Sequence, residues 1–261
     1  MKRKVHAIAA TLAERLSQWD GVEAVLLGEA ADIEVYDPYF TIDLDVYFGG
    51  TLPGLDVRSC LMQGMEAFET SPVSFVDRFL LDGLPVSIHY MRTGDVDAML
   101  LRIAEKTWVF HEPGTNMLSR IERGEVLFSR VGWIDESRAA LAHVPEEFWW
   151  QARLRAFSSA ERALADMGAA SFRSDDLFFL LSTARLLRSV ASFLFAVNRR
   201  FEPAGRMLAE RIAELPVLPG EFLGRLEGLL GSSGGLSRDA RREIAEILVR
   251  SLMPMALGTP A

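Results

Sequence analysis

Two carboxylates separated by one apolar residue, Asp43 and Asp45, are the strongest candidates for chemistry in this sequence. They lie in a segment, 41–48, where apolar and polar residues alternate, as is typical of a β-strand with one buried face. Both carboxylates should therefore share one face, while Leu44 faces the core. Such a pair can hold Mg²⁺, which completes its shell with water and substrate phosphates, as in two-metal phosphoryl-transfer sites. An edge strand with a merely acidic outer face fits the same pattern, and the strand alone leaves both interpretations open.

The elements that position this pair follow from hydrophobic periodicity. Strands are predicted over 22–27, 41–48, 74–81 and 85–91, with a hairpin turn at Asp82-Gly83. Helices are predicted over 5–19, 58–69 and 95–101, and then over 145–167, 175–198, 204–214, 219–230 and 237–253, with Asp175 and Ser237 as N-caps. This pattern predicts an α+β fold, in which a small mixed sheet with flanking helices is followed by an all-α helical bundle. The expected domains are residues 1–144 and 145–261.

The first part of the chain resembles the nucleotidyltransferase superfamily. The predicted strand 22–27 leads to Gly28-Glu29, and Asp43-Leu44-Asp45-Val46 follows on the next strand. In that family, a strand, a glycine and a later Asp-apolar-Asp/Glu strand stand in this order. The resemblance implies that Asp43 and Asp45 bind catalytic Mg²⁺ or Mn²⁺, and that Gly28 and Glu29 lie at the nucleotide.

A second resemblance lies downstream, in the segment Leu194-Phe195-Ala196-Val197-Asn198-Arg199-Arg200-Phe201-Glu202-Pro203-Ala204-Gly205-Arg206. It is similar to a helix–turn–helix of bacterial nucleotidyltransferase-like proteins of unknown function. If the helical domain packs over the α/β domain, Asn198 and Arg206 can contact the nucleotide, with the arginine on a phosphate. In the alternative interpretation, Asn198 caps the long helix and Arg206 pairs with Glu210, one turn on.

The chain departs from the nucleotidyltransferase pattern at two positions. Glu29 replaces the small hydroxyl residue that follows the motif glycine, and a carboxylate there would repel a triphosphate unless a cation lay between them. The strand expected to supply a third carboxylate offers Ser87 and His89 instead. His89 can act as a base or a metal ligand, or be an ordinary hydrogen-bonded residue. An acid of the connection 29–40 (Glu29, Asp32, Glu34 or Asp37) could replace the missing carboxylate, or these residues form a solvated acidic loop.

Composition and charge exclude several classes of binding partner and site. The chain has 261 residues and a net charge of −8, of which residues 1–144 carry −9 and the rest +1. An acidic first half is not expected to bind a nucleic-acid backbone. The single cysteine excludes an intrachain disulfide and a cysteine zinc site. The longest apolar stretch, 177–197, contains Arg185 and Arg188, so it predicts a core helix; no membrane association and a cytoplasmic location are expected.

Two functions remain open. The leading hypothesis is a metal-dependent nucleotidyltransferase that moves a nucleoside monophosphate from a nucleoside triphosphate to a small-molecule or protein acceptor. Asp43 and Asp45 would hold Mg²⁺, and a carboxylate or His89 would orient or deprotonate the attacking hydroxyl. The second is a catalytically degenerate protein of the same fold that binds a nucleotide, a metal or a protein partner in a regulatory role. Glu29 and the missing third carboxylate favour the second.

Overall fold

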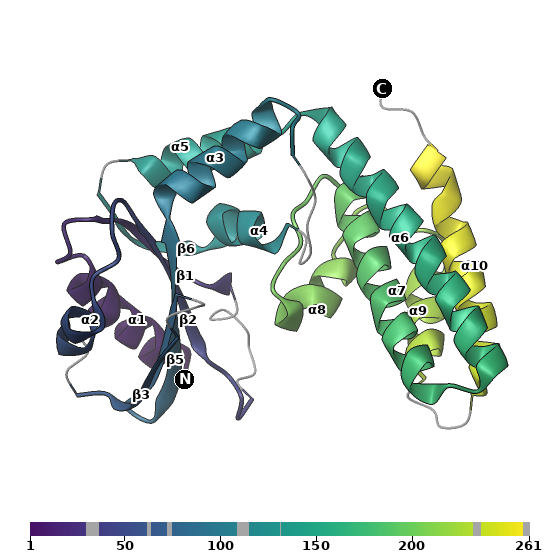
Figure 1. Cartoon of the computed structure of the whole chain (residues 1–261), viewed down its shortest axis with the longest axis horizontal. Helices are drawn as coiled ribbons and strands as arrows, with labels where there is room; N and C mark the ends of the chain where they lie inside the picture. The colour runs from purple at the N-terminus through teal and green to yellow at the C-terminus, as the bar shows by residue number, and fades with distance from the viewer. Residues whose placement is uncertain are drawn as a thin grey trace. The chain divides into compact units, whose positions relative to one another are not determined.

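The chain divides into two compact units. The structure, a computed structural model, describes residues 1–29, 37–61, 64–71, 75–108, 115–130, 132–231 and 236–257, with residues 60, 61, 71 and 257 in backbone only. One unit contains Met1–Trp108 and Asn116–Val144, and the other contains Val109–Thr115 and Pro145–Ala261. The first is a mixed sheet with helices, and the second is helical (Figure 1). The predicted α+β fold class is thus confirmed.

The first unit is built on a six-stranded sheet with the order β3-β4-β5-β2-β1-β6. The strands are β1 (Val22–Leu27), β2 (Ile42–Phe48), β3 (Glu66–Ser71), β4 (Val76–Leu81), β5 (Leu84–Arg92) and β6 (Glu125–Ser129). Neighbours β2 and β5 are parallel, and the other neighbours are antiparallel. The β4–β5 hairpin turns at Asp82 and Gly83, both at positive φ, which confirms the predicted turn.

One face of the sheet packs on the first helix, α1 (Lys2–Leu16). Buried apolar residues at helical spacing on α1 contact the apolar face of the central strands in one core; these residues are Val5, Ile8, Leu12 and Leu16 on the helix, and Ile42, Leu44, Val46 and Ile88 on β2 and β5. Figure 1 shows α1 and α2 (Leu55–Leu61) on one side of the sheet and α4 (Asn116–Arg123) on the other. The polar face of β2 is therefore turned away from α1.

Three helices belong to the opposite side, α3 (Thr93–Ala104), α4 (Asn116–Arg123) and α5 (Trp133–Ala142). Tyr47 of β2 is buried there, with its ring centroid 5.0 Å from that of Trp133. Arg138 of α5 donates hydrogen bonds to the carbonyls of Ile121 and Gly124, at the end of α4. These bonds satisfy carbonyl groups that a helix end leaves without partners, and they fix α4 beside the sheet.

The predicted helix over 58–69 is wrong in its second half. Helix α2 ends at Leu61, Gly64 adopts a positive φ of 89°, and β3 begins at Glu66. Alanine and glutamate favour a helix locally, but Glu69 pairs with Arg78 across the β3–β4 ladder. Sheet pairing thus overrides helix propensity in this segment.

The predicted elements also omit α4, β6 and α5. Helix α4 has 8 residues and β6 has 5, and short elements carry little periodic signal. Among them, Leu118 and Ile121 of α4 are fully buried. This omission matters because α4 supplies a side chain to the candidate site.

The second unit contains a long helical hairpin and four shorter helical segments. They are α6 (Glu146–Arg173), α7 (Asp176–Val197), the 3₁₀ helix η2 (Gly205–Met207), α8 (Leu208–Ala213), α9 (Phe222–Leu230) and α10 (Arg238–Leu257). The Asp175 side chain accepts a hydrogen bond from the backbone of Phe178, and Ser237 accepts one from Ala240, so both predicted N-caps are confirmed.

Helix α7 is, within the described ranges, the one helix long and apolar enough to cross a membrane by length and composition. It also forms the core of the helical unit, where Leu186, Val190, Phe193 and Leu194 are buried against α6 and α10. The core helices of soluble proteins share this composition, and the packing of α7 is the one expected from Arg185 and Arg188 within the apolar stretch.

Candidate functional site

Asp43 and Asp45 lie on the same face of β2 but in different environments. Their apolar neighbours Ile42, Leu44 and Val46 belong to the core on the other face, as the alternation predicted. The Asp43 side chain is 38% exposed, whereas that of Asp45 is 1% exposed. The two carboxylates of the motif are therefore not equivalent: one faces solvent and the other is enclosed.

Asp45 is held by an arginine of α4. Arg120 donates from Nε to Asp45 Oδ2 at 2.7 Å and from Nη2 to Oδ1, so its planar guanidinium engages both carboxylate oxygens. Burial raises the pKa of Asp45 to about 6, against the lowering effect of Arg120. The carboxylate is therefore mainly ionised at pH 7 and is neutralised by a permanent cation of the same chain.

His89 of β5 stands beside Asp43. The parallel register pairs Asp45 with His89 and Asp43 with Ser87, which places all four residues on one face, as predicted for the strand. His89 Nε2 lies 3.9 Å from Asp43 Oδ1 and 3.3 Å from Ser87 Oγ. Burial, together with the charges of Arg120 and Arg78, lowers the pKa of His89 to about 4. The imidazole is therefore neutral at pH 7, and its proton cannot be used to attract a phosphate.

Ser87, His89 and Asp43 do not form a nucleophile–base–acid relay. In such a relay the histidine uses one ring nitrogen for the hydroxyl and the other for the carboxylate. Here Ser87 and Asp43 both approach Nε2. The neutral ring can accept or donate one hydrogen bond at this atom, which suits ligand recognition.

A groove of about 550 Å³ runs across the strands from this point. Its polar lining follows the register of the sheet, from Glu69 on β3 through Arg78 on β4 and Ser87 on β5 to Asp43 on β2. Arg78 is exposed and has no ion-pair partner among the residues described. The groove thus offers the guanidinium of Arg78 and the carboxylates of Glu69 and Asp43, and Arg78 and Asp43 lie about 10 Å apart across two strand spacings.

Gly28 comes close to the backbone of Asp43. Its amide donates to the Asp43 carbonyl at 2.8 Å, and a Cβ at this position would lie 3.2 Å from that oxygen and 3.3 Å from the Asp43 Cβ. Glycine is therefore favoured here by the contact between β1 and β2. The following residue, Glu29, lies 3.5 Å from Arg123 of α4, so a second arginine of this helix faces the carboxylate that departs from the family pattern.

Among the described residues, the donor set does not fit a two-metal centre. Both oxygens of Asp45 are engaged by Arg120, which leaves Asp43 as the accessible carboxylate of the motif. No group of three or more histidine, cysteine, aspartate or glutamate residues in the described parts of the chain could hold a metal ion. Divalent cations prefer several oxygen ligands, and here a guanidinium stands where the second metal-binding carboxylate would act.

Of the other predicted residues, Asn198 and Arg206 belong to the helical unit. The Asn198 side chain donates to the carbonyls of Leu194 and Val217 and accepts from the Val217 amide, so it closes α7 and ties the following loop to it. Arg206 is exposed on η2, and its contact with a nucleotide stays a prediction. In the acidic connection, Asp37 accepts a hydrogen bond from the Tyr39 amide, while Asp32 and Glu34 lie outside the described residues.

Sequence reasoning missed three arginines of the site: Arg78, Arg120 and Arg123. Arg78 alternates with Asp77 and Phe79 on a predicted strand, so its exposed face could have been predicted. Arg120 and Arg123 required α4 to be recognised, and the spacing of Leu118 and Ile121 was the available signal.

Comparison with known proteins gives two similarities. Residues 111–206 match a family described as a domain of unknown function, DUF4037. The chain is also similar to the crystal structure of a nucleotidyltransferase-like protein from Exiguobacterium sibiricum 255-15, with 15% sequence identity and a TM-score of 0.46 over 98% of this chain and 77% of that chain. No curated protein matches the chain.

Proposed function

We propose that this chain is a nucleotidyltransferase-like protein that binds a polar ligand, such as a nucleotide, in the groove beside Asp43 and does not transfer nucleotides. The observation that carries the proposal is the bidentate pair between Arg120 and Asp45. Transfer would require the two motif carboxylates to share metal ions, and Arg120 already neutralises one of them. The ligand-binding role is the second of the two functions that the sequence leaves open.

The charges around the groove support binding without a divalent cation. Asp45 pairs with Arg120 and Glu29 with Arg123, and the charged side chains that line the groove itself are Asp43, Glu69 and Arg78. The guanidinium of Arg78 can hold a phosphate or a carboxylate, while Asp43 can accept from hydroxyl or amino groups of the same ligand. Neutral His89 adds a hydrogen bond without adding charge.

Nucleotide titration by calorimetry, with and without Mg²⁺, tests the proposal, together with an assay for pyrophosphate release. We expect nucleotide affinity to differ less than twofold between the two conditions, and no pyrophosphate to be released. In a transferase, metal and triphosphate would bind with positive coupling, and Asp43→Asn would abolish both the coupling and the release. Such coupling in the wild type would overturn the binding role.

A second experiment addresses the arginine directly. Arg120→Met should leave Asp45 free to bind Mn²⁺, so Mn²⁺ affinity should rise at least tenfold over the wild type. The control, Arg102→Met, removes an exposed arginine of α3 whose side chain donates to the Ala98 carbonyl, and it should not change Mn²⁺ affinity. In the chain that keeps Arg120, Asp45→Asn should leave Mn²⁺ binding unchanged. Tight Mn²⁺ binding that Asp45→Asn removes would contradict the proposal, even if Arg120→Met fails to fold.

A nucleotidyltransferase activity remains the second candidate, because Asp43 is exposed in a groove and Gly28 lets the backbone of the neighbouring strand approach it. This function requires Arg120 to leave Asp45 when metal and triphosphate bind. Mg²⁺-dependent pyrophosphate release from the wild type would support it.

A further inference from the structure

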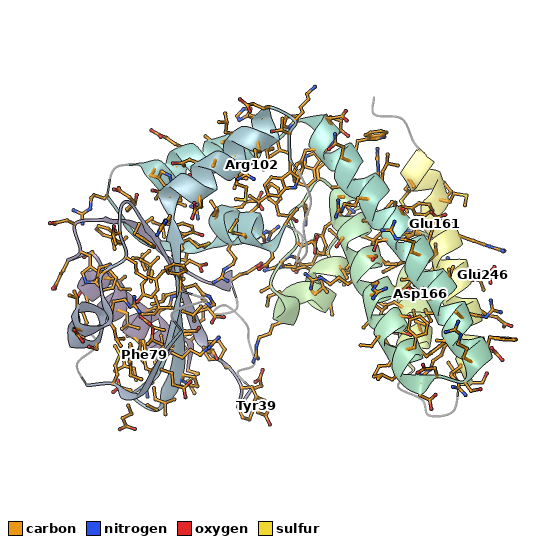
Figure 2. All side chains as sticks on the ribbon, in the orientation of Figure 1. Tyr39, Phe79, Arg102, Glu161, Asp166 and Glu246 are labelled. Atoms are coloured by element: carbon orange, nitrogen blue, oxygen red, sulfur yellow. The ribbon has the colours of Figure 1, made fainter. Side chains whose placement is uncertain are left out.

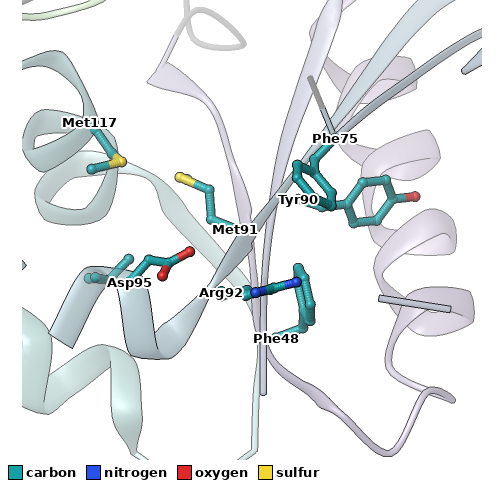
Figure 3. A pocket seen from close by; sticks show the side chains of 8 residues that line it. Phe48, Phe75, Tyr90, Met91, Arg92, Asp95 and Met117 are labelled. Carbon is teal, nitrogen blue, oxygen red and sulfur yellow. The ribbon is translucent and has the colours of Figure 1, made fainter. Parts of the chain in front are cut away.

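A separate pocket lies at the other end of the two parallel strands. Phe48 is the last residue of β2 and Arg92 the last of β5, and both line a pocket of about 260 Å³ (Figure 3). Asp43 is five residues before Phe48, which corresponds to about 16 Å along a strand. The pocket is thus distinct from the groove beside Asp43. Ligands commonly bind beyond the carboxyl ends of parallel strands, where the chain leaves the sheet.

The walls of this pocket are aromatic and thioether side chains. With the aliphatic Val96, they come from five different elements or connections and comprise Phe48, Phe75, Tyr90, Met91, Val96 and Met117. Phe75 is 42% exposed and Met117 is 37% exposed, so large apolar surface faces an open space. Flat rings and polarisable sulfur atoms favour contact with another aromatic ring.

Phe75 is held in an unusual backbone conformation. Its φ is +47°, in the left-handed region that bulky residues rarely adopt, and its carbonyl accepts a hydrogen bond from the Tyr90 amide at 2.9 Å. Strained residues of this kind often occur at ligand sites, where the surroundings hold them in place. The bond to β5 keeps the Phe75 ring at the pocket wall.

Two charged side chains, Arg92 and Asp95, also line this pocket. Arg92 and Asp95 are exposed, and neither makes an ion pair or a side-chain hydrogen bond with any residue that the structure describes. In Figure 3, Arg92 points toward Phe48, whereas Asp95 lies on the side of Met91 and Met117. The two charges therefore stand at different places on the pocket wall and do not neutralise each other.

The neighbouring Arg58 differs from Arg92 because its charge is already paired. Arg58 lines an adjacent hollow of about 440 Å³ that shares Phe75 and Arg92 with this pocket. Arg58 is committed to the buried Asp77, with Nε 3.0 Å from Oδ2, and to Thr70. Arg92 is thus the guanidinium here that remains available to an anion.

We propose that this pocket binds a small aromatic carboxylate, with its ring among the aromatic and methionine side chains and its carboxylate on Arg92. A cavity of about 150 Å³ lined by apolar side chains can hold benzene, so the larger volume here accommodates one ring with its carboxylate. A guanidinium binds a carboxylate through two parallel hydrogen bonds. Asp95 repels a second anionic group, so the ligand carries one negative charge. This proposal does not depend on the function of the groove beside Asp43.

Calorimetric titration or ligand-detected NMR with benzoate on the full chain tests the proposal. Benzoate should bind, and benzyl alcohol, which keeps the ring but lacks the charge, should bind at least tenfold more weakly to the wild type. Arg92→Met should lower benzoate affinity at least tenfold and leave benzyl alcohol unaffected. Arg102→Met, which removes an exposed arginine of α3 (Figure 2), is the matched control and should change benzoate affinity less than twofold.

A separate ligand comparison tests the role of Asp95. Terephthalate, which carries a second carboxylate, should bind at least fivefold more weakly than benzoate, and this difference should disappear in Asp95→Asn. Equal affinity of the wild type for both ligands would remove Asp95 from the proposal. Absence of benzoate binding, equal binding of benzoate and benzyl alcohol, or benzoate binding that Arg92→Met does not change would overturn the pocket's assignment.

Discussion

Two buried aspartates on opposite faces of one sheet are each held by an arginine. Asp77 of β4 shares the core face with Ile88 and pairs with Arg58 of α2, while Asp45 lies on the other face and pairs with Arg120 of α4. Asp77 is 0% exposed and Asp45 is 1% exposed. A buried aspartate–arginine pair therefore does not by itself mark a functional site in this fold.

The difference lies in what surrounds each pair. Arg58 also donates to the Pro53 carbonyl and to Thr70, and its guanidinium carbon lies 5.4 Å from the Tyr90 ring centroid. Its side chain is 11% exposed, whereas that of Arg120 is 25% exposed and stands beside the groove that Asp43 and His89 line. The Arg58 pair is enclosed by structure, and the Arg120 pair borders a place where a ligand can bind. A third pair, Arg123 with Glu29, has side chains that are 31% and 14% exposed, so it is more accessible to solvent than the other two pairs.

The largest effect is expected at the enclosed pair. Arg58→Met should lower the free energy of unfolding by about 3 to 5 kcal/mol, because the Asp77 charge would be buried without a partner. Urea unfolding at pH 7 measures this loss. The double variant Arg58→Met with Asp77→Leu removes both charges and should recover most of the stability. If the double variant is as unstable as the single one, the loss comes from packing and not from the unpaired charge.

Arg120→Met should lower the free energy of unfolding by a smaller amount, about 2 to 3 kcal/mol at pH 7, because water in the groove can reach the unpaired carboxylate. Without Arg120, the pKa of Asp45 should rise above its present value of about 6. A raised pKa in the folded state means that stability increases as the pH falls through that pKa, so the cost of the substitution should shrink between pH 7 and pH 5. A cost that stays constant over this range would mean that Asp45 is already protonated in the wild type.

The face of the sheet that carries the site could be predicted from the sequence, but the partners of its carboxylates could not. A period of two on each strand assigns Asp43, Asp45, Ser87 and His89 to their faces without any tertiary information. The prediction that they line one surface also needs the parallel pairing of β2 and β5, which the sequence alone does not give.

Arg120 illustrates what the sequence could not supply. It is 75 residues from Asp45, on an 8-residue helix whose stability comes from packing and not from its own propensity. The error at β3 has the same origin, because Glu69 is in a strand only through its pairing with β4. Local periodicity predicted where each carboxylate points, and the identity of the charge opposite to it was set by tertiary structure.

His89 gives a pH-dependent test of the groove side. Its pKa of about 4 lies below the ordinary value of 6.5, so the unfolded chain gains a proton between these values that the folded chain does not. This difference lowers stability as the pH falls from 6.5 to 4, and the raised pKa of Asp45 acts in the opposite direction between about 6 and 3.8. Replacement of the histidine isolates its contribution. The difference in free energy of unfolding between His89→Gln and the wild type should shift in favour of the variant by about 1 to 3 kcal/mol as the pH falls from 7 to 4.5. Unfolding curves of both proteins over this range provide the comparison, and parallel curves would show that the pKa of His89 is the same in the folded and the unfolded chain.

The smallest effect is expected at the most exposed of the three pairs. Arg123 lies 3.5 Å from Glu29 and 3.6 Å from Glu122, and its side chain is 31% exposed. Exposed ion pairs contribute up to about 1 kcal/mol because water screens the charges and the side chains lose freedom when they pair. Arg123→Gln should therefore lower the free energy of unfolding by about 0.5 kcal/mol, and this loss should fade in about 0.5 M salt, where the screening length is only a few ångströms. The Arg120→Met loss should persist in the same salt, because salt screens buried charges much less. If Arg123→Gln proved as costly as Arg120→Met, or equally insensitive to salt, then burial would not be what separates the two arginines of α4. Glu29 would then be a second enclosed carboxylate of the site, held in the same way as Asp45.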